Sequence, residues 1–517
     1  MAVVLIGFMG AGKSTAAQQL AEALQVPCRD TDELLEGRLG HTVAQEFAAS
    51  GEAAFRELEE QVVLETLADA GAGLDAVVAL GGGSVLSERV REQLRGHLTV
   101  LLDVSPQEAW RRVQGTEGAA DRPLASDWEG FRDLHAGRAQ LYESLADAVL
   151  VGLAEGALAG VADGLAMLAS APAGTRLLWA CSDSGQYPVL IGEGLLGALG
   201  DGGLWPLPRS RSRSFLVSDR AVAALYGEQL GEVALRIEIE PGEQSKTLAS
   251  AEHVWETLAG AGMTRADHIV GLGGGVVGDL AGFCAATYQR GVPIVHVPTS
   301  LVAQVDSAYG GKTGVDLPQA KNYVGAYHQP AGVLVDPATL ATLPAQELAA
   351  GWVEVLKTAL IAGGALWERV AAGGEVDTWT VFACAATKLK TVAADERDGG
   401  RRQLLNLGHT VGHAIETATG YGRYRHGEAV GLGLLAALRL SGQQQLREDV
   451  QGLLAARGLP VVLQDADVDA VLEALRRDKK RIGADVPFVL VQAPGEVSWG
   501  QQVPAQDVRA AVSELLA

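Results

Sequence analysis

The sequence predicts an α/β protein with three parts: an N-terminal P-loop domain, a Rossmann-like α/β domain and a mainly α-helical domain. A short apolar strand enters a glycine-rich loop at Gly7, and a second strand, glycine turn and helix follow from His268. Beyond residue 341 the apolar residues recur mostly with helical spacing. A length of 517 residues suits about three folding units. We expect the domains at residues 1–170, 171–340 and 341–517.

Composition and charge narrow the possible partners. Apolar residues make up 48% of the chain and there are 65 glycines, which favours a packed globular protein over a disordered one. The formal net charge of −22 argues against nucleic acid or an anionic membrane as a partner, because both require a basic surface. Small anionic substrates would then have to be bound by local clusters of Lys and Arg.

Three further features favour a cytoplasmic location. The four cysteines, Cys28, Cys181, Cys284 and Cys384, lie far apart, so we expect them to be reduced and buried. The N-terminal apolar run has no basic leader and no cleavage site, so it predicts a first β-strand and not a signal peptide. The Ala/Gly/Leu-rich stretch near residues 148–174 is too polar to span a bilayer.

The first motif is a phosphate-binding loop. Residues 2–6 predict a strand that runs directly into GFMGAGKST, which is the complete GxxxxGK[ST] pattern in its strand-to-helix setting. In such a loop backbone N–H groups surround phosphate, the lysine reaches the β and γ oxygens, and the first hydroxyl holds Mg²⁺. The sequence therefore predicts binding of ATP with magnesium by Gly10, Gly12, Lys13, Ser14 and Thr15.

Further polar residues lie where parallel strands are expected to end. Asp30 and Asp32 follow a second short apolar segment, and residues 77–80 predict a strand that ends in the triple glycine 81–83. Taken singly, such residues are more often solvated or ion-paired on the surface. The same part of the chain contains Arg56, Arg122 and Arg138.

Together these motifs resemble shikimate kinase over residues 1–170. The shikimate contacts that this resemblance implies are Asp32, Arg56, Gly82 and Arg138. It also implies Asp30 near the magnesium and Arg122 as a lid arginine over the phosphates. Lys13, Mg²⁺ and Arg122 would neutralise the transferred phosphoryl group, and Asp32 would accept or orient the hydroxyl proton. Another small-molecule kinase, or a non-catalytic module that regulates the rest of the chain, stays an alternative.

The second domain begins with alternating strands and helices. Residues 215–219 and 237–240 predict strands, and residues 268–273 predict another that enters the turn GGGVVGD. This turn has the strand-to-helix setting of a dinucleotide site, but it departs from the usual GxGxxG with an acidic residue about twenty positions later. The pattern by itself leaves NAD binding open, because glycine turns also serve packing.

Three of the ten histidines fall within residues 409–426. His409 and His413 are four apart, so both rings project from one helix face, and His426 follows a Gly/Tyr turn. A catalytic zinc needs about three N/O ligands and one open position. Glu354, near Lys357 in an apolar helical run, is a candidate carboxylate because a charge there needs a partner. Spacing alone would pair His409 with His413, and surface histidines are the simpler alternative.

The motifs AGWVEVLK, KLKTVAADE, NLGHTVGHAIE and RHGEAV resemble 3-dehydroquinate synthase, and similar motifs extend over residues 180–500. The resemblance places zinc, or another divalent metal such as cobalt, on Glu354, His409 and His426, and it assigns His413 to the substrate phosphate. It also implies NAD as a cofactor. The implied NAD contacts are Asp219, Glu243, Lys246, Gly275, Asp279, Thr299, Ser300, Lys312 and Lys321.

The substrate that this resemblance implies is 3-deoxy-D-arabino-heptulosonate 7-phosphate, which carries a carboxylate and a phosphate. The metal would hold the hydroxyl that NAD⁺ oxidises; phosphate then leaves, the hydride returns and the ring closes without net redox change. Asp306 and Lys357 would orient the hydroxyls. The implied substrate contacts are Arg290 from a second subunit, Lys312, Asn322, Lys388, Arg402, Asn406, His413, Lys479 and Lys480.

Two alternatives stay open for this half of the chain. A polyol dehydrogenase would share the fold and NAD but would not need the Lys and Arg set, and a different sugar-phosphate cyclase would differ in its product. With both resemblances, we expect a bifunctional enzyme of aromatic biosynthesis that acts on two non-adjacent steps. We also expect a homodimer formed through the synthase part.

Overall fold

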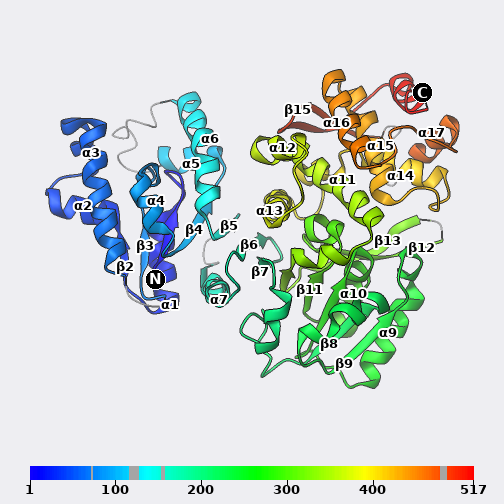
Figure 1. Ribbon diagram of the computed structural model, residues 1–517, viewed down its shortest axis with the longest axis horizontal. Coiled ribbons are helices and arrows are strands. Elements are labelled where there is room, and N and C mark those ends of the chain that lie inside the picture. The colour runs from blue at the N-terminus through cyan, green and yellow to red at the C-terminus, as the bar shows by residue number, and fades with distance from the viewer. Residues whose placement is uncertain (71–73, 116–126, 153–157, 319, 478–485, 517) are drawn as a thin grey trace. The chain divides into compact units, whose positions relative to one another are not determined.

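The computed structural model describes residues 1–70, 74–115, 127–152, 158–318, 320–477 and 486–516 (Figure 1). The chain divides into two compact units. Unit 1 comprises Met1–Cys181, Gly185–Gly192 and Asp201–Pro206, and unit 2 comprises Ser182–Ser184, Glu193–Gly200 and Leu207–Ala517. None of the helices in the described ranges combines the length and the apolar character that crossing a membrane would require.

Unit 1 is built on a parallel sheet. Its strands are β1 (Val3–Ile6), β2 (Cys28–Asp30), β3 (Val77–Ala79), β4 (Leu98–Asp103), β5 (Ala148–Val151), β6 (Arg176–Ser182) and β7 (Gly185–Ile191). The first five run in the order β2-β3-β1-β4-β5, and β6 pairs in parallel with β5. Strands β1 and β5 consist entirely of buried aliphatic residues, as is typical of a parallel sheet whose two faces are covered.

Helices connect these strands (Figure 1). They are α1 (Lys13–Leu24), α2 (Thr31–Leu39), α3 (Val43–Ala68), η1 (Ser84–Leu86), α4 (Glu88–Leu94), α5 (Pro106–Gln114), α6 (Trp128–Leu145) and α7 (Leu158–Ala169). Side chains that accept a backbone N–H set several starting points, since an N-cap satisfies a donor that the helix leaves unpaired. These caps are Asp30, Thr42, Ser87, Ser105 and Asp127.

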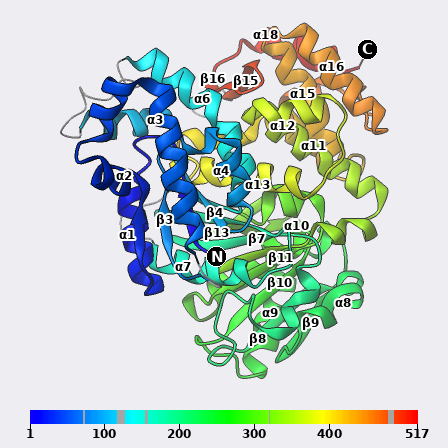
Figure 2. The same cartoon turned by 60° about the vertical axis from the view of Figure 1, so that its left-hand side comes forward.

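The N-terminal half of unit 2 is built on five parallel strands. Its strands are β8 (Ser214–Asp219), β9 (Leu235–Ile239), β10 (His268–Gly273), β11 (Ile294–Pro298) and β14 (Gly332–Val335), in the order β14-β11-β10-β8-β9. Helices α8 (Arg220–Tyr226), α9 (Leu248–Gly260) and α10 (Gly275–Thr287) accompany them (Figures 1 and 2). Phe215, Ile269, Leu280 and Ile294 belong to the buried cluster that joins sheet and helices.

The C-terminal half of unit 2 is mainly helical. Its helices are α11 (Ala345–Ala362), α12 (Gly364–Ala371), α13 (Thr378–Ala394), α14 (His409–Ala418), α15 (His426–Leu440), α16 (Gln444–Ala456), α17 (Val468–Arg476) and α18 (Ala505–Ser513). Two antiparallel hairpins complete the unit, namely β12 (Lys312–Leu317) with β13 (Ala320–Tyr327), and β15 (Phe488–Ala493) with β16 (Glu496–Gln501). The short turns are η4 (Leu196–Asp201), η5 (Gly227–Leu230), η6 (Glu243–Ser245), η7 (Tyr288–Arg290), the π-helical η8 (Ala303–Ser307), η9 (Pro337–Thr342) and η10 (Arg401–Asn406).

Two glycines let α15 approach its neighbours closely. A Cβ added to Gly427 would lie 1.9 Å from the carbonyl oxygen of Ala350 on α11. A Cβ added to Gly433 would lie 1.9 Å from the carbonyl oxygen of Gly408, which precedes α14. Both helices therefore meet α15 at separations that a larger side chain would prevent.

The predicted fold class is confirmed, and two details differ from the expectations. Strand β6 was not among the predicted strands. Cys28 is exposed on the short strand β2, whereas the other three free cysteines are buried as predicted. Arg122, Lys479 and Lys480 lie outside the described residues.

Candidate active sites

The loop between β1 and α1 forms the first site. Gly10 has a φ of 79°, and a Cβ there would lie 2.5 Å from the carbonyl oxygen of Ala109, so this position requires glycine. Lys13 folds back over the loop, with Nζ 2.9 Å from the Gly7 oxygen and 3.2 Å from the Phe8 oxygen. Helix α1 begins after Gly12 without a side-chain cap, which leaves its first N–H groups to an anion.

The remaining loop hydroxyls lie at the start of the same helix. Ser14 and Thr15 are both exposed. The loop therefore has the backbone, the cation and the hydroxyls that a nucleotide with magnesium requires.

The triple glycine after β3 is the second component. A Cβ on Gly81 would lie 2.8 Å from Oδ1 of Asp32, and a Cβ on Gly83 would lie 2.0 Å from Nη1 of Arg56. A Cβ on Gly82 would lie 3.5 Å from the backbone nitrogen of Met9 in the P-loop. The glycine run therefore lies between the P-loop and two of the predicted shikimate contacts.

Helix α6 supplies the third component. Arg138, which is buried, donates from Nη1 to the carbonyl oxygen of Gly82 at 3.4 Å. Tyr142 donates to the same oxygen at 2.5 Å. The structure thus brings together Asp32, Arg56, Gly82 and Arg138, which come from four separate segments.

Two aspartates lie at the end of β2. Asp30 caps α2 by accepting the backbone N–H of Asp32 at 2.9 Å. Asp32 is open to solvent on one side, but the surrounding protein desolvates its carboxyl and, with the charge of Asp30, raises its pKa to about 6. A carboxyl group with such a pKa is suited to accept a proton near neutral pH.

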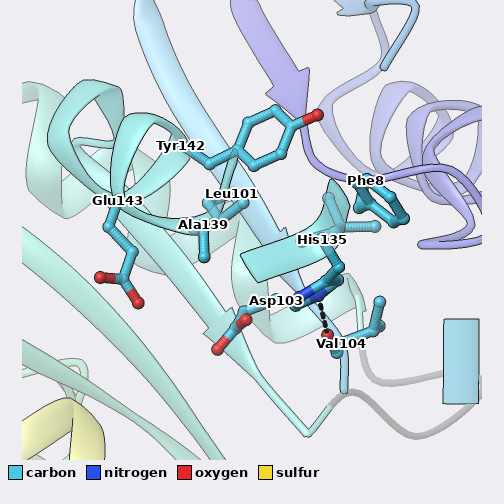
Figure 3. A pocket seen from close by; sticks show the side chains of 9 residues that line it. Phe8, Leu101, Asp103, Val104, His135, Ala139, Tyr142 and Glu143 are labelled. Atoms are coloured by element: carbon cyan, nitrogen blue, oxygen red, sulfur yellow. Dashed lines mark hydrogen bonds between the residues drawn. The ribbon is translucent and has the colours of Figure 1, made fainter. Parts of the chain in front are cut away.

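A small pocket lies against the P-loop in unit 1 (Figure 3). Phe8 lines it and makes edge-to-face contacts with Phe131 and His135, each with ring centroids 5.0 Å apart. His135 is itself held by Nε2 at 3.1 Å from the carbonyl oxygen of Val104. The lining contains none of the residues that the sequence predicted, and its contacts serve to hold Phe8 of the loop.

The glycine turn after β10 forms the first part of the site in unit 2. A Cβ on Gly274 would lie 3.1 Å from Oγ of Ser300, and one on Gly275 would lie 3.2 Å from Oγ of Ser307. Thr299 is buried at the end of β11. Asp219 ends β8 and caps α8 by accepting the N–H of Val222 at 2.9 Å. These residues share the carboxyl edge of the sheet, where α/β folds bind ligands.

A buried lysine contacts another residue of the predicted NAD site. Lys246 is 3% exposed, and its Nζ contacts Oδ2 of Asp279 and Oδ1 of Asn322. Asn322 was predicted as a substrate contact, and the structure places it with this group. Lys321, beside it, has Nζ 4.0 Å from Oε1 of Glu243.

The second part of this site is a cluster of imidazoles around one carboxylate. Glu354 on α11 is fully buried. Its Oε1 lies 3.6 Å from Nε2 of His409 on α14 and 3.5 Å from Nε2 of His426 on α15. One ring nitrogen from each of His409, His413 and His426 lies within 4.8 Å of the others. Helices α11, α14 and α15 therefore bring all four side chains to one point.

The donor set fits a divalent cation. The distances of 3.5 and 3.6 Å are too long for hydrogen bonds, but zinc with bonds of about 2.1 Å separates tetrahedral ligands by about 3.4 Å. Neither oxygen of Glu354 has a hydrogen bond of normal geometry to a described residue, although Lys357 Nζ lies 2.5 Å from Oε2. Burial would raise the pKa of Glu354, yet Lys357 and the histidines hold it well below its usual range.

In His409 and His426 the other ring nitrogen also has a partner. Nδ1 of His409 lies 3.2 Å from the carbonyl oxygen of Leu407, and Nδ1 of His426 lies 3.3 Å from Oε2 of Glu416. A metal-binding histidine usually makes such a contact, because it fixes the tautomer and the direction of the ring. His413 lies beside the other two rings, at 5.3 Å from His409 and 5.7 Å from His426 between centroids.

A chain of opposite charges extends from Glu354. Lys357 Nζ lies 3.7 Å from Oδ2 of Asp306, whose Oδ1 lies 2.5 Å from Nζ of Lys388. Burial would raise the pKa of Asp306, but the two lysines lower it to about 2. Burial lowers the pKa of Lys388 to about 8 despite the charge of Asp306. Asp306 belongs to the π-helical turn η8, a feature frequent at functional sites.

The other predicted substrate contacts are more dispersed. Arg402 is 1% exposed. Its guanidinium donates from Nη1 to the backbone carbonyl of Glu396 at 2.5 Å and from Nη2 to the backbone carbonyl of Gly310 at 2.9 Å, and so connects two backbone segments. Lys312 Nζ lies 2.6 Å from Oδ2 of Asp398. Asn406 is half-buried at the end of η10, and Arg290 is exposed in η7 with a φ of 69°.

Two buried acids were missed by the sequence analysis. Glu59 on α3 accepts from Arg56 Nη1 at 2.6 Å and from the Ser84 hydroxyl at 2.9 Å. Glu416 on α14 contacts both His426 and Lys321. Each lies three positions after a predicted site residue, Arg56 or His413, and this helical spacing was the available signal.

Fold and sites define a two-part α/β enzyme, with a P-loop kinase site in unit 1 and a metal-type centre beside a glycine turn in unit 2. A family model of shikimate kinase matches residues 9–158. Models of the N-terminal and C-terminal parts of 3-dehydroquinate synthase match residues 236–350 and 351–481.

Curated relatives agree with the models for unit 2. A 3-dehydroquinate synthase of Symbiobacterium thermophilum is 42% identical over 352 residues, which cover 63% of this chain and 96% of the relative. The 3-dehydroquinate synthase of Halorhodospira halophila is 42% identical over 346 residues, covering 64% and 97%. The chain belongs to the 3-dehydroquinate synthase family and also contains a shikimate kinase domain. It is a bifunctional enzyme of the shikimate pathway with both activities.

Solved structures of two other synthases share the fold of unit 2. One is 2-deoxy-scyllo-inosose synthase with carbaglucose-6-phosphate, NAD⁺ and Co²⁺, at a TM-score of 0.58 and 25% identity, covering 66% of this chain and 100% of that one. Another is 2-epi-5-epi-valiolone synthase from Streptomyces hygroscopicus subsp. jinggangensis with NAD⁺ and Zn²⁺ bound, at a TM-score of 0.58 and 26% identity, covering 64% and 96%.

Proposed function

We propose that unit 1 transfers the γ-phosphoryl group of ATP to shikimate and forms shikimate 3-phosphate. The supporting observation is the convergence of Asp32, Arg56 and Arg138 on the glycine run beside the P-loop. The two arginines would bind the carboxylate and ring hydroxyls, and Asp32 would take the hydroxyl proton. Lys13 would hold the transferred phosphate, and Ser14 with Asp30 would hold magnesium. The lid role of Arg122 stays a prediction.

We propose that unit 2 converts 3-deoxy-D-arabino-heptulosonate 7-phosphate into 3-dehydroquinate and phosphate. The observation that carries this proposal is the convergence of Glu354, His409 and His426. We assign the metal to these three side chains and leave His413 to the substrate phosphate. A bound divalent cation would polarise a substrate hydroxyl, and NAD⁺ would reversibly accept a hydride.

The residues of the chain would do the positioning. Glu354, kept ionised by Lys357, would supply the carboxylate ligand. Asp306, held between Lys357 and Lys388, would orient the reacting hydroxyls. Lys388 and Arg402 would bind the substrate carboxylate, and Lys312 would bind its phosphate. Arg402 is held in place for this role by its hydrogen bond to the Gly310 carbonyl. The remaining proposed contacts are Asn322, Asn406, Lys479, Lys480 and a second subunit's Arg290.

The NAD⁺ site is proposed at the carboxyl ends of the parallel strands of unit 2. Its residues are Asp219, Glu243, Lys246, Gly275, Asp279, Thr299, Ser300, Lys312 and Lys321. The buried contact of Lys246 with Asp279 supports this assignment, because it fixes a polar surface beside the glycine turn. We further propose domains at residues 1–170, 171–340 and 341–517, a homodimer through the synthase part, and a cytoplasmic location.

Separate assays on the full-length chain test both proposals. Kinase activity is measured with ATP, magnesium and shikimate, and synthase activity with heptulosonate phosphate, NAD⁺ and zinc. Lys13→Ala should abolish the first activity and spare the second, and Glu354→Gln should do the reverse. The thermal unfolding of each variant checks that the substituted unit is folded. Absence of shikimate 3-phosphate, or of 3-dehydroquinate, from the wild-type reactions would overturn the corresponding proposal.

A further inference from the structure

One buried carboxylate contacts both halves of the proposed synthase site. Glu416 lies on α14 and is 2% exposed. Its Oε1 lies 3.0 Å from Nζ of Lys321, and its Oε2 lies 3.3 Å from Nδ1 of His426. Each oxygen therefore has its own partner, and the two partners come from different elements, β13 and the start of α15.

The contact with His426 determines how that ring is presented. With Nδ1 directed at Glu416, Nε2 is the atom that faces Oε1 of Glu354 at 3.5 Å. A carboxylate in this position holds the tautomer with the proton on Nδ1, so the lone pair of Nε2 is available to a cation. His409 obtains the same effect from a backbone carbonyl, that of Leu407, at 3.2 Å. Glu416 is thus the side chain that orients one of two imidazoles.

The contact with Lys321 extends toward the dinucleotide residues. Nζ of Lys321 lies 5.0 Å from the ring centroid of Tyr421 and 4.0 Å from Oε1 of Glu243. The hydroxyl of Tyr421 pairs in turn with Thr417 Oγ1, one residue after Glu416, at 3.0 Å. Lys321 is therefore held in a defined place between Glu416 and Glu243.

We propose that Glu416 is a positioning residue that couples metal binding at Glu354, His409 and His426 to NAD⁺ binding at Glu243 and Lys321. This inference rests on the proposed function of unit 2. A cation bound at the imidazoles would hold the ring of His426 in place. That ring would hold Glu416 through Nδ1, and Glu416 would in turn hold Lys321. NAD⁺ bound against Lys321 fixes the same atoms from the other side. Such coupling is reciprocal: each ligand strengthens the other by the same factor.

The test uses the full-length protein with Zn²⁺ and NAD⁺ as probes. Zinc affinity is measured by competition with a chromophoric chelator. NAD⁺ affinity is measured by titration of the zinc-loaded and the chelator-treated protein. The variants are Glu416→Gln, which removes the charge, and Glu416→Asp, which keeps the charge but shortens the reach. Glu448→Gln on the exposed face of α16 is the matched control, and the thermal unfolding of each variant reports on the folding of unit 2.

We expect wild-type protein to bind NAD⁺ about tenfold more tightly with zinc than without it, within the usual range for coupled sites. Glu416→Gln should weaken zinc binding by about 10- to 100-fold and abolish the effect of zinc on NAD⁺ affinity. Glu416→Asp should recover part of the zinc affinity. Glu448→Gln should match the wild type in both measurements.

Several results would overturn the inference. Equal NAD⁺ affinity with and without zinc in the wild type would do so without any variant. Wild-type zinc affinity in Glu416→Gln would also overturn it. So would a result in which both Glu416 variants lose the same zinc affinity and the same NAD⁺ affinity, with the NAD⁺ loss equal in zinc-loaded and chelator-treated protein. Failure of the wild type to bind zinc or NAD⁺ at all would instead refute the proposed function of unit 2.

Discussion

Nε2 of His426 lies 3.5 Å from Oε1 of Glu354, although His426 begins α15 and Glu354 lies within α11. Glu354 lies in the interior of α11, where a carboxylate is costly to bury unless a cation compensates it. The helix that carries His426 reaches α11 because Gly427 follows directly. The centre therefore depends on one charged residue in an apolar helix and on one residue without a side chain.

Glu354→Gln should weaken zinc binding by more than about 100-fold, which exceeds the loss expected of a supporting residue. The amide is a poor ligand, and it also leaves Lys357 with Asp306 as its remaining acidic contact. The measurement is zinc competition on the full-length chain. Glu368→Gln, at an exposed position on α12, should retain wild-type affinity. Zinc bound equally well by Glu354→Gln would favour the three histidines as the ligand set.

Gly427→Ala should displace α15 from α11, because the new Cβ would lie 1.9 Å from the Ala350 oxygen. We expect lower thermal stability and weaker zinc binding, since His426 moves with the helix start. Gly452→Ala is the control: it lies in α16 with nothing within 4 Å of its added Cβ. That substitution should be neutral or stabilise by up to about 1 kcal/mol, the ordinary gain of Ala over Gly in a helix. Equal effects of the two variants would contradict the packing argument.

Gly83→Ala should raise the KM for shikimate by about tenfold or more and leave the KM for ATP nearly unchanged. Its Cβ would lie 2.0 Å from the guanidinium of Arg56, which must then move away from its hydrogen bond with Glu59. A small displacement of a positioned side chain is enough to cost such a factor. Gly137→Ala on α6, with nothing within 4 Å, serves as the control. An unchanged KM for shikimate would show that Arg56 does not contact it.

Acid should destabilise unit 2 through two buried histidines. Burial and Arg209 lower the pKa of His268 to about 4, and burial and His328 lower that of His296 to about 4. Unfolded histidine titrates near about 6.5, so between pH 6.5 and 4 the unfolded chain binds protons that the folded chain does not. Stability should be complete above pH 6.5 and fall as the pH drops toward 4.

The measurement for this prediction is the unfolding temperature against pH by calorimetry. His268→Gln should reduce the acid-dependent loss by roughly half, because His296 still contributes. It also loses hydrogen bonds with Ser212 and Ser214, so its stability near pH 7 should be lower. An identical pH profile for wild type and variant would contradict the assignment to His268.

Contiguous motifs made much of unit 1 predictable. The P-loop is one strand, one turn and one helix start, so its residues are close together in space as well as in sequence. Asp32, Arg56, Gly82 and Arg138 were proposed only through a resemblance, and the structure brings them together. Glu59 was missed because an acid three residues after an arginine on a helix is common on protein surfaces.

The centre in unit 2 shows the opposite case. Helical spacing places His409 and His413 on one face, and on that ground alone they would have been the metal pair. The resemblance chose Glu354, His409 and His426, and the ligand assignment itself stays a prediction. The sequence offered no reason to connect Glu416 on α14 with Lys321 on β13, since nearly a hundred positions separate them and only a tertiary contact unites them.

By itself, the sequence determined what local periodicity and contiguous motifs carry: two α/β parts, a helical end, a phosphate loop and a cluster of histidines. The tertiary structure decided which side chains lie close to one another, because the approach of α15 to α11 and α14 depends on glycines and on packing between distant segments. Local free energies select strands and helices, whereas the positions of Glu354, His426 and Glu416 relative to one another are set by contacts that exist only after the core has formed.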